Sequence, residues 1–100
     1  MDKEKLISTL GLAYRANKIT IGYDQIVKEL KKKNISCVFS DLSDDSDSAR
    51  QIKNKCDYYN VPLYNVLTSE ELSKICSKHN VKTISLHDDG FHELVKKYID

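Results

Sequence analysis

The stretch Ile-Thr-Ile-Gly-Tyr-Asp-Gln-Ile-Val-Lys, residues 19–28, decides how this chain folds, because it changes from strand to helix around one glycine. Residues 19–21 are typical of a short strand, and Gly22 permits a tight turn and close approach of another molecule to the backbone. The first turn of the following helix has free N–H groups and the positive end of the helix dipole, which together receive phosphate. The stretch therefore predicts a strand–turn–helix unit that presents an anion-binding backbone.

The helix predicted at residues 23–33 has one polar and one apolar face. Gln25, Lys28 and Lys32 are spaced i, i+3 and i+7, so they share one face. Three apolar side chains point elsewhere, toward a core: Ile26, Val27 and Leu30. The run at 31–33 adds further lysines, although a basic run near a helix end also serves simply to complement the dipole. The favoured interpretation is an RNA-binding edge.

The length and the net charge of the chain limit its possible domain organisation and its possible partners. The chain has 100 residues and a formal net charge of +1, which predicts a single domain over residues 1–100 and leaves nucleic-acid binding open. Basic residues are unevenly placed: residues 1–34 hold eight Lys or Arg against four Asp or Glu, whereas residues 35–60 hold three against five. This skew predicts a locally positive surface on a neutral body.

Cysteine usage and hydropathy indicate the compartment. Cys37, Cys56 and Cys76 are odd in number, far apart and set in apolar patterns, which predicts buried thiols in a reducing cytosol. The chain shows no charged-then-apolar leader, and no apolar run approaches the ~20 residues of a membrane helix. We expect a cytoplasmic protein without a membrane partner.

Helical and strand patterns alternate from end to end without a linker or repeat. Helices are expected near residues 6–14, 23–33, 49–59, 70–76 and 91–98, and strands near 19–21, 36–40, 62–67 and 82–86. The inward side chains of the last helix are expected to be Phe91, Leu94, Val95 and Tyr98. Alternation of this kind predicts the α/β class, as a three-layer α/β/α sandwich.

Several element ends carry local signals. Asn17 fits the left-handed position that ends the first helix. Ser46 or Asp47 fits the N-cap of the third helix, and residues 68–71 form a capping box for the fourth. Asp88 fits the N-cap of the last helix.

The sequence gives only weak support for a metal site, for catalysis or for stacking of tyrosines on bases. The acidic residues at 41–47 lack the glycine and the terminal glutamate of a calcium loop, so we expect solvation and helix capping there. His87 and Asp88 would make an orienting pair for base catalysis, but no nucleophile stands at a defined elbow. Tyr58 and Tyr59 would stack on bases, although Tyr59 is expected to pack inward with Tyr58 half-exposed beside it. We therefore expect no enzyme, metal or cofactor.

Several separated segments, in their order and spacing, resemble one family. They are residues 10–18 (Leu-Gly-Leu-Ala-Tyr-Arg-Ala-Asn-Lys), 22–28 (Gly-Tyr-Asp-Gln-Ile-Val-Lys), 40–43 (Ser-Asp-Leu-Ser), 56–62 (Cys-Asp-Tyr-Tyr-Asn-Val-Pro) and 67–72 (Leu-Thr-Ser-Glu-Glu-Leu). The second falls where the family has its RNA-reading Gly-x-Asn-Glu-x-x-Lys. The chain is similar throughout to the kink-turn-binding ribosomal proteins of the large subunit (L-seven-Ae / L-thirty-e type), in particular to their bacterial YlxQ-like members.

The resemblance implies a fold and a function. The fold is an α/β/α sandwich with a small mixed four-stranded sheet, and the function is binding of sharply bent RNA with tandem sheared G·A pairs. Residues 77–81 would form a second contact loop beside the start of the second helix. The implied partners are structured RNA, such as ribosomal RNA or a kink-turn, and the ribosome, with the protein acting as a monomer. The candidate RNA-binding residues are Lys18, Gly22, Asp24, Gln25, Lys28, Lys31, Lys32, Lys78, His79 and Asn80.

The chain departs from the family pattern at four positions. Asp24 stands where the ribosomal members have Asn and Gln25 where they have Glu, so a charge-assisted bond to guanine becomes neutral, at a cost of about 1 kcal/mol. Ser73 and Ser77 stand where the family tends to have glycine. These departures leave a second hypothesis open, namely a protein-interaction module that kept the fold and lost RNA contact.

Overall fold

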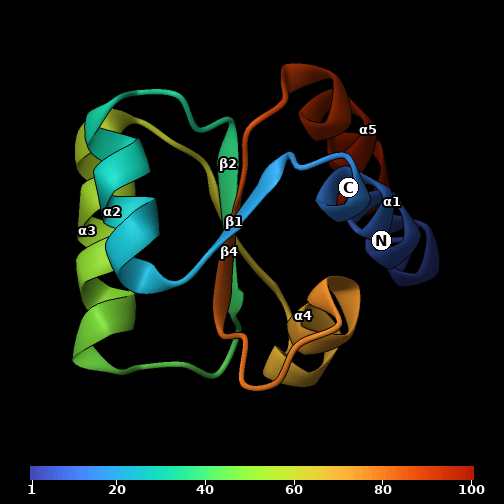
Figure 1. Cartoon of the computed structure of the whole chain (residues 1–100), viewed down its shortest axis with the longest axis horizontal. Helices are drawn as coiled ribbons and strands as arrows, with labels where there is room; N and C mark the ends of the chain where they lie inside the picture. Colours follow the sequence, from blue (N-terminus) through green and yellow to red (C-terminus); the bar gives the residue numbers. More distant parts are fainter.

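The computed structural model describes all 100 residues and shows a sheet between two layers of helices (Figure 1). In chain order the elements are α1 (Lys3–Arg15), β1 (Ile19–Ile21), α2 (Tyr23–Lys31), β2 (Cys37–Asp41), α3 (Asp47–Tyr59), β3 (Leu63–Leu67), α4 (Ser69–Cys76), β4 (Thr83–Leu86) and α5 (Asp89–Ile99). The strand order is β1-β4-β2-β3, in which β2 and β3 are parallel and the other two pairs antiparallel. The predicted α/β/α sandwich with a mixed four-stranded sheet is therefore confirmed.

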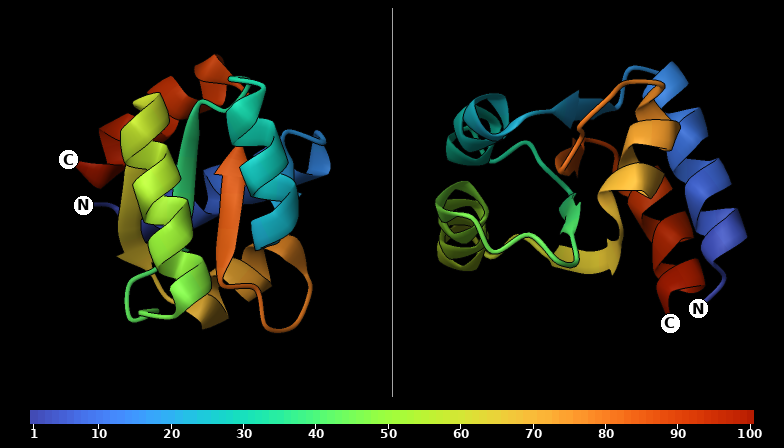
Figure 2. Two further views of the ribbon diagram at one scale, coloured as in Figure 1. Left: turned by 90° about the vertical axis from the view of Figure 1, so that its left-hand side faces the viewer. Right: turned by 90° about the horizontal axis from the view of Figure 1, so that it is seen from below.

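The two helical layers enclose two hydrophobic cores. Helices α2 and α3 cover one face of the sheet, and α1, α4 and α5 cover the other (Figure 2). The larger core lies under the three-helix layer around Phe39, Leu67 and Ile84, and the smaller lies under α2 and α3 around Val38 and Ile52. None of the five helices combines the length and apolar character that crossing a membrane requires.

The central strands β2 and β4 are buried along their whole length, because helices cover both of their faces. The buried side chains of Thr83 and Ser85 are hydrogen-bonded, as burial requires. The Thr83 hydroxyl donates to the Phe39 carbonyl oxygen at 3.2 Å, and Ser85 Oγ lies 2.9 Å from His87 Nε2. The three cysteines are free and buried, as predicted.

The predicted helix caps and the left-handed conformation of Asn17 are confirmed. The side chain of Ser46 caps α3 by accepting from the Ala49 N–H, and Asp88 caps α5 by accepting from the Phe91 N–H. Thr68 and Glu71 form the expected capping box at α4. Asn17 adopts the left-handed conformation, with φ 60°.

Four predictions of detail are wrong. Helix α2 ends at Lys31, and Lys33 takes a left-handed conformation (φ 58°) that cannot continue it. Pro62, which we expected to be the first residue of a strand, instead precedes β3. Its carbonyl oxygen accepts from the Val38 N–H. Tyr58, which we expected to be half-exposed, has 79% of its surface exposed. Leu94 is 41% exposed because α5 is rotated to bury His92, whose ring bonds Tyr64.

Asp41 joins the end of β2 to the start of α4. Its Oδ1 accepts from the backbone N–H of Ser43 at 2.7 Å and from the Ser43 hydroxyl, and its Oδ2 accepts from the Ser69 N–H at 3.0 Å. The Ser43 backbone N–H is the main cause that holds the Asp41 pKa below its usual value. The carboxylate thereby fixes the β2–α3 loop and α4 relative to each other.

We predict that Asp41→Asn lowers the free energy of unfolding by about 1–3 kcal/mol at neutral pH, since an amide cannot accept all three bonds. A depressed folded pKa stabilises the fold above the unfolded pKa of about 3.9, and this contribution is lost as the pH falls through the folded value. Urea unfolding across pH 2–7 should therefore show the two proteins converging at acid pH. A difference that is constant over this range would contradict the role of the charge.

The two serines where the family tends to have glycine differ in the structure. Ser77 caps the C-terminus of α4 with φ 52°, a left-handed conformation that favours glycine. Ser73 lies inside α4, and its Oγ accepts from the Val81 N–H at 2.9 Å. Only position 77 has the backbone conformation that glycine serves.

Replacing each of these two serines by glycine should change the free energy of unfolding in opposite directions. Ser77→Gly should raise the free energy of unfolding by about 1 kcal/mol because the strain is relieved. Ser73→Gly should lower it by about 2 kcal/mol, because glycine weakens a helix interior and the buried Val81 N–H loses its acceptor. Thermal unfolding of both variants measures the two signs, and equal signs would refute this interpretation.

Candidate nucleic-acid interface

The junction of β1 and α2 presents an open backbone. Gly22 is the N-cap of α2 with φ 99° and makes no side-chain cap. A Cβ atom built there would meet no atom within 4 Å outside the two neighbouring residues, so the space beside the Gly22 backbone is open. Ile26 donates its N–H to the Gly22 carbonyl oxygen at 3.1 Å, which begins the helical hydrogen bonds. The N–H groups at residues 23–25 therefore face outward at the positive end of the helix dipole.

The exposed face of α2 carries the predicted polar residues. Asp24, Gln25 and Lys28 are exposed, and Lys31 and Lys32 continue the row to the far end of the helix. None of these three lysines forms an ion pair in the structure. The amide nitrogen of Gln25 donates to Glu29 Oε1 at 3.2 Å, and the carbonyl oxygen of this amide has no partner. The face therefore offers free ammonium groups and one amide acceptor.

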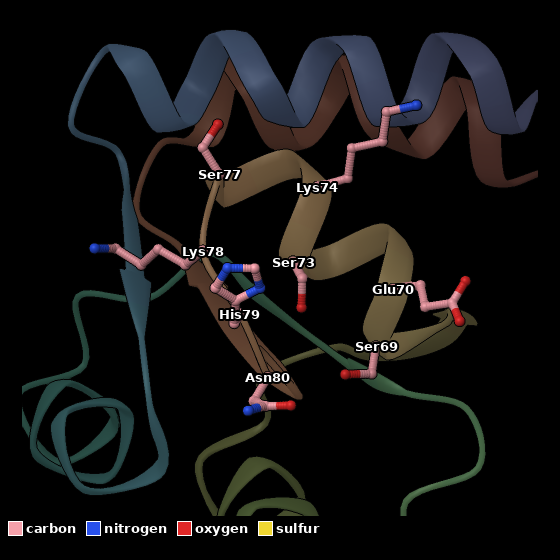
Figure 3. A pocket seen from close by; sticks show the side chains of 8 residues that line it. All are labelled: Ser69, Glu70, Ser73, Lys74, Ser77, Lys78, His79 and Asn80. Carbon is pink, nitrogen blue, oxygen red and sulfur yellow. The ribbon is translucent and has the colours of Figure 1, made fainter.

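Strand pairing brings the second predicted segment to the same corner. Because Ile21 pairs with Ile84 in the antiparallel β1–β4 register, Gly22 lies beside the segment that enters β4. That segment includes Lys78, His79 and Asn80, which are all exposed. In Figure 3 the Lys78 side chain extends toward β1. The structure thus places the two predicted contact segments at one end of the sheet.

Lys18 lies apart from the corner, as do Lys31 and Lys32 at the far end of α2. Lys18 precedes β1, whereas Gly22 follows it, so the strand separates the two by roughly 13 Å at about 3.3 Å per residue. The Lys18 carbonyl oxygen accepts from the His87 N–H at the opposite end of the sheet. A ligand at the corner would reach Lys18 only by running along β1.

Two carboxylates of the β2–α3 loop, Asp44 and Asp45, form an acidic boundary at the corner that the sequence does not predict. The Tyr23 hydroxyl donates to Asp44 Oδ2, which joins the first turn of α2 to the β2–α3 loop. Burial, together with this bond to a carboxylate, raises the Tyr23 pKa and so keeps the phenol a donor. The loop also carries the exposed carboxylate of Asp45. No local pattern signals this contact, since its two residues lie 21 positions apart.

The other chemical candidates have structural partners. The Asp88 carboxylate caps α5, and His87 instead contacts Ser85 Oγ and, through Nδ1 at 3.1 Å, the Asn34 carbonyl oxygen. Ser85 is fully buried, so this serine is not open to a substrate. The orienting pair of His87 with Asp88 is thus not formed.

A polar hollow of about 580 Å³ lies beside α4 (Figure 3). Its walls come from one face of α4 and from residues 77–80, and every lining residue is polar or charged. The sequence gives no sign of it, because the hollow depends on how the segment after α4 turns back along the helix.

Comparison with known sequences identifies relatives over nearly the whole chain. Residues 4–95 match the Ribosomal protein L7Ae/L30e/S12e/Gadd45 family. A Bacillus subtilis protein named RNA-binding protein YlxQ is 30% identical over 91 residues, which cover 91% of each chain. An Enterococcus faecium protein of the same name is 24% identical over 99% of this chain and 95% of its own length.

Solved structures agree in fold. A Bacillus halodurans protein of unknown function has a TM-score of 0.89 and 28% identity, over 96% of this chain and 97% of that one. The Giardia lamblia 15.5kD RNA binding protein has a TM-score of 0.78 over 97% of this chain and 83% of its own; at 15% identity it supports the fold alone. The match over residues 4–95, the YlxQ relatives and the shared architecture establish that this chain belongs to the ribosomal protein L7Ae/L30e/S12e/Gadd45 family.

Proposed function

We propose that this chain is a non-catalytic RNA-binding protein that recognises sharply bent structured RNA, such as a kink-turn, through the β1–α2 corner. One observation carries the proposal: the uncapped start of α2 at Gly22 stands open beside a row of unpaired lysines and the exposed residues 78–80. Free N–H groups and ammonium groups together suit crowded phosphates. The names of the YlxQ relatives support RNA as the ligand class.

The proposed contacts divide into positioning and reading. Lys28 and Lys32 neutralise phosphates, which fixes the RNA on the protein without reading its sequence. The free carbonyl oxygen of Gln25 accepts a hydrogen bond from a guanine N–H group at a sheared G·A pair. Most of the selectivity comes from the shape of the bend, as is usual for helical RNA.

The surface also favours RNA over a protein partner. A broad exposed apolar patch is a mark of a protein-interaction surface. The exposed large apolar side chains of this chain are instead spread over the N-terminus, three helices and one loop: Met1, Leu12, Leu42, Tyr58 and Leu94. We keep the protein-interaction module as the second candidate, which binding tests on RNA will separate from the first.

We also propose a cellular compartment and an oligomeric state for the protein. Its three buried, free cysteines fit a reducing cytoplasm. A monomer that associates with the ribosome or with another structured RNA is the form we propose, in line with the ribosomal family to which the chain belongs.

We predict that Lys28→Glu combined with Lys32→Glu weakens RNA binding at least about tenfold and lowers its salt dependence, because two phosphate contacts become repulsive. Fluorescence anisotropy measures this on a kink-turn RNA with tandem sheared G·A pairs. A straight duplex, in which G·C pairs replace the G·A pairs, tests the preference for the bend.

The matched control is Lys53→Glu combined with Lys97→Glu, which changes the net charge equally at two exposed lysines outside the corner that form no ion pair. It should retain binding within about twofold, since long-range charge effects are screened at physiological salt. Equal losses in both double variants would refute a local interface, and unchanged binding in the first would refute the corner itself.

Asp24→Asn should strengthen binding to the kink-turn RNA by on the order of 1 kcal/mol, about fivefold, because it removes a carboxylate that repels phosphate. The same change removes a favourable charge at the N-terminus of α2 and should slightly lower thermal stability, so the two effects have opposite signs. The control, Asp57→Asn on α3, removes a likewise exposed carboxylate outside the corner. A gain in both variants would show a general charge effect instead.

A further inference from the structure

We propose that the exposed ring of Tyr58, near the C-terminal end of α3, stacks on an unpaired base of a single-stranded RNA segment. We call Tyr58, Asn54 and Lys55 together the tyrosine platform. The inference rests on the proposed function and deepens it, because it adds the binding of an unpaired base to the recognition of a bend. The platform lies at the end of the helical layer opposite the β1–α2 corner (Figure 2).

The Tyr58 ring is held in place but not covered. Its surface is 79% exposed, the highest fraction among the exposed large apolar side chains of the chain. Tyr59 is partly buried against the smaller core and meets the Tyr58 ring edge to face, with the ring centroids 4.9 Å apart and the planes at 90°. A contact of this kind covers at most one face of a ring. A face of Tyr58 is therefore open to a flat partner.

A hollow of about 470 Å³ adjoins the ring, and its lining combines two aromatic side chains with an amide and a cation. Asn54 and Lys55 precede Tyr58 by four and three residues, so they stand beside it on one face of α3. The exposed amide of Asn54 can donate to and accept from the edge of a base. Lys55 forms no ion pair and is free to meet a phosphate. The hollow thus offers one group for the face, the edge and the phosphate of a nucleotide.

The neighbours of Tyr58 favour RNA over a protein partner. The cores of protein–protein interfaces are enriched in aromatic residues but depleted of lysine. Sites for single-stranded nucleic acid instead combine aromatic rings with a positive surface that follows the backbone, and their stacking tolerates any base. A cation and an amide beside an exposed ring match the second pattern.

The lysine row of α2 leads toward the platform. Helices α2 and α3 lie side by side and run in the same direction, so Lys31 and Lys32 lie at the same end of the layer as Tyr58 (Figure 2). The nine residues of α2 span roughly 13 Å at 1.5 Å per residue. Asp57 carries a carboxylate next to Tyr58 in sequence, but one residue of helix turns it by about 100° away from the ring. A strand that leaves the corner along α2 would reach the platform over these lysines.

The test is Tyr58→Ala in the full chain, with a single strand of about twelve adenylates as the probe and fluorescence anisotropy as the measurement. We expect affinity to fall about tenfold, because a base loses its stacking surface. Tyr58→Phe keeps the ring and should bind within about twofold of wild type. Tyr58→Leu is apolar without an aromatic ring and should bind as weakly as the alanine variant. Equal binding by the phenylalanine and leucine variants would contradict stacking.

Two controls separate stacking from charge and from general surface effects. A strand of the same length without bases keeps its phosphates, so wild type and Tyr58→Ala should bind it equally. Leu12→Ala removes another exposed apolar side chain, on α1 in the opposite helical layer, and should leave the affinity for adenylates within about twofold of wild type. A loss in Leu12→Ala as large as in Tyr58→Ala would overturn a local platform.

Lys55→Gln tests the cation of the platform. The slope of log K against log salt should become shallower by about 0.7, the value for one phosphate of a single strand. The matched control is Lys53→Gln, because Lys53 is another lysine of α3 without an ion pair, and it lies outside the lining of the hollow. An equal change of slope in both variants would contradict a contact at Lys55.

The outcomes separate this inference from the proposed function, which is tested on kink-turn RNA with fully paired ends. If Tyr58→Ala binds adenylates as wild type does while the double variant at Lys28 and Lys32 loses the kink-turn, the platform is wrong and the corner stands. If only Tyr58→Ala loses its RNA, the platform is supported and the corner is overturned. If neither variant changes binding, or if wild type does not bind adenylates, the platform falls.

A substitution of opposite sign guards against loss of folding. Tyr58→Trp enlarges the aromatic surface and should raise the affinity for adenylates about threefold, an effect that unfolding cannot mimic. The same variant should bind the strand without bases as wild type does. A gain on both strands, or on neither, would contradict stacking at this position.

Discussion

The antiparallel register of β1 against β4 is the constraint on which the candidate interface depends. By pairing Ile21 with Ile84, it places Gly22 and the segment before β4 at the same end of the sheet, although about sixty residues of chain separate them. Three residues of β1 suffice for this because α2 follows directly and buries Ile26 and Leu30 against the sheet. A shift of one residue would turn each side chain of β1 to the other face and dismantle the corner.

Local physics makes much of this fold predictable. Caps such as Ser46, Thr68 and Asp88 act within one helical turn, so the sequence nearby contains all of the information. Leu94 was expected inside because apolar spacing alone ignores the bond by which Tyr64 keeps His92 buried. The tie from Asp41 to α4 spans 28 positions and likewise has no local signal.

The candidate interface also has a part that the sequence predicts and a part that it does not. The open glycine and the lysine row of α2 belong to one continuous segment, so periodicity finds them. The acidic boundary at Asp44 arises only when α2 packs against the β2–α3 loop, 21 positions further along the chain. The hollow beside α4 forms within residues 69–80, where the segment after the helix turns back along it. Charge is unevenly placed around the corner, with carboxylates at Asp44 and Asp45 and ammonium groups along α2, and a net charge of +1 conceals this.

The backbone at Gly22 has a consequence for the thermodynamics of recognition. Strand pairing and the bond from Ile26 to the Gly22 carbonyl oxygen already hold the receptor in shape before any ligand arrives. Little conformational entropy is then lost by the polypeptide on association. In the binding mode that we propose, the deformation would fall on the nucleic acid, so molecules that bend readily would be favoured even where no side chain touches their bases.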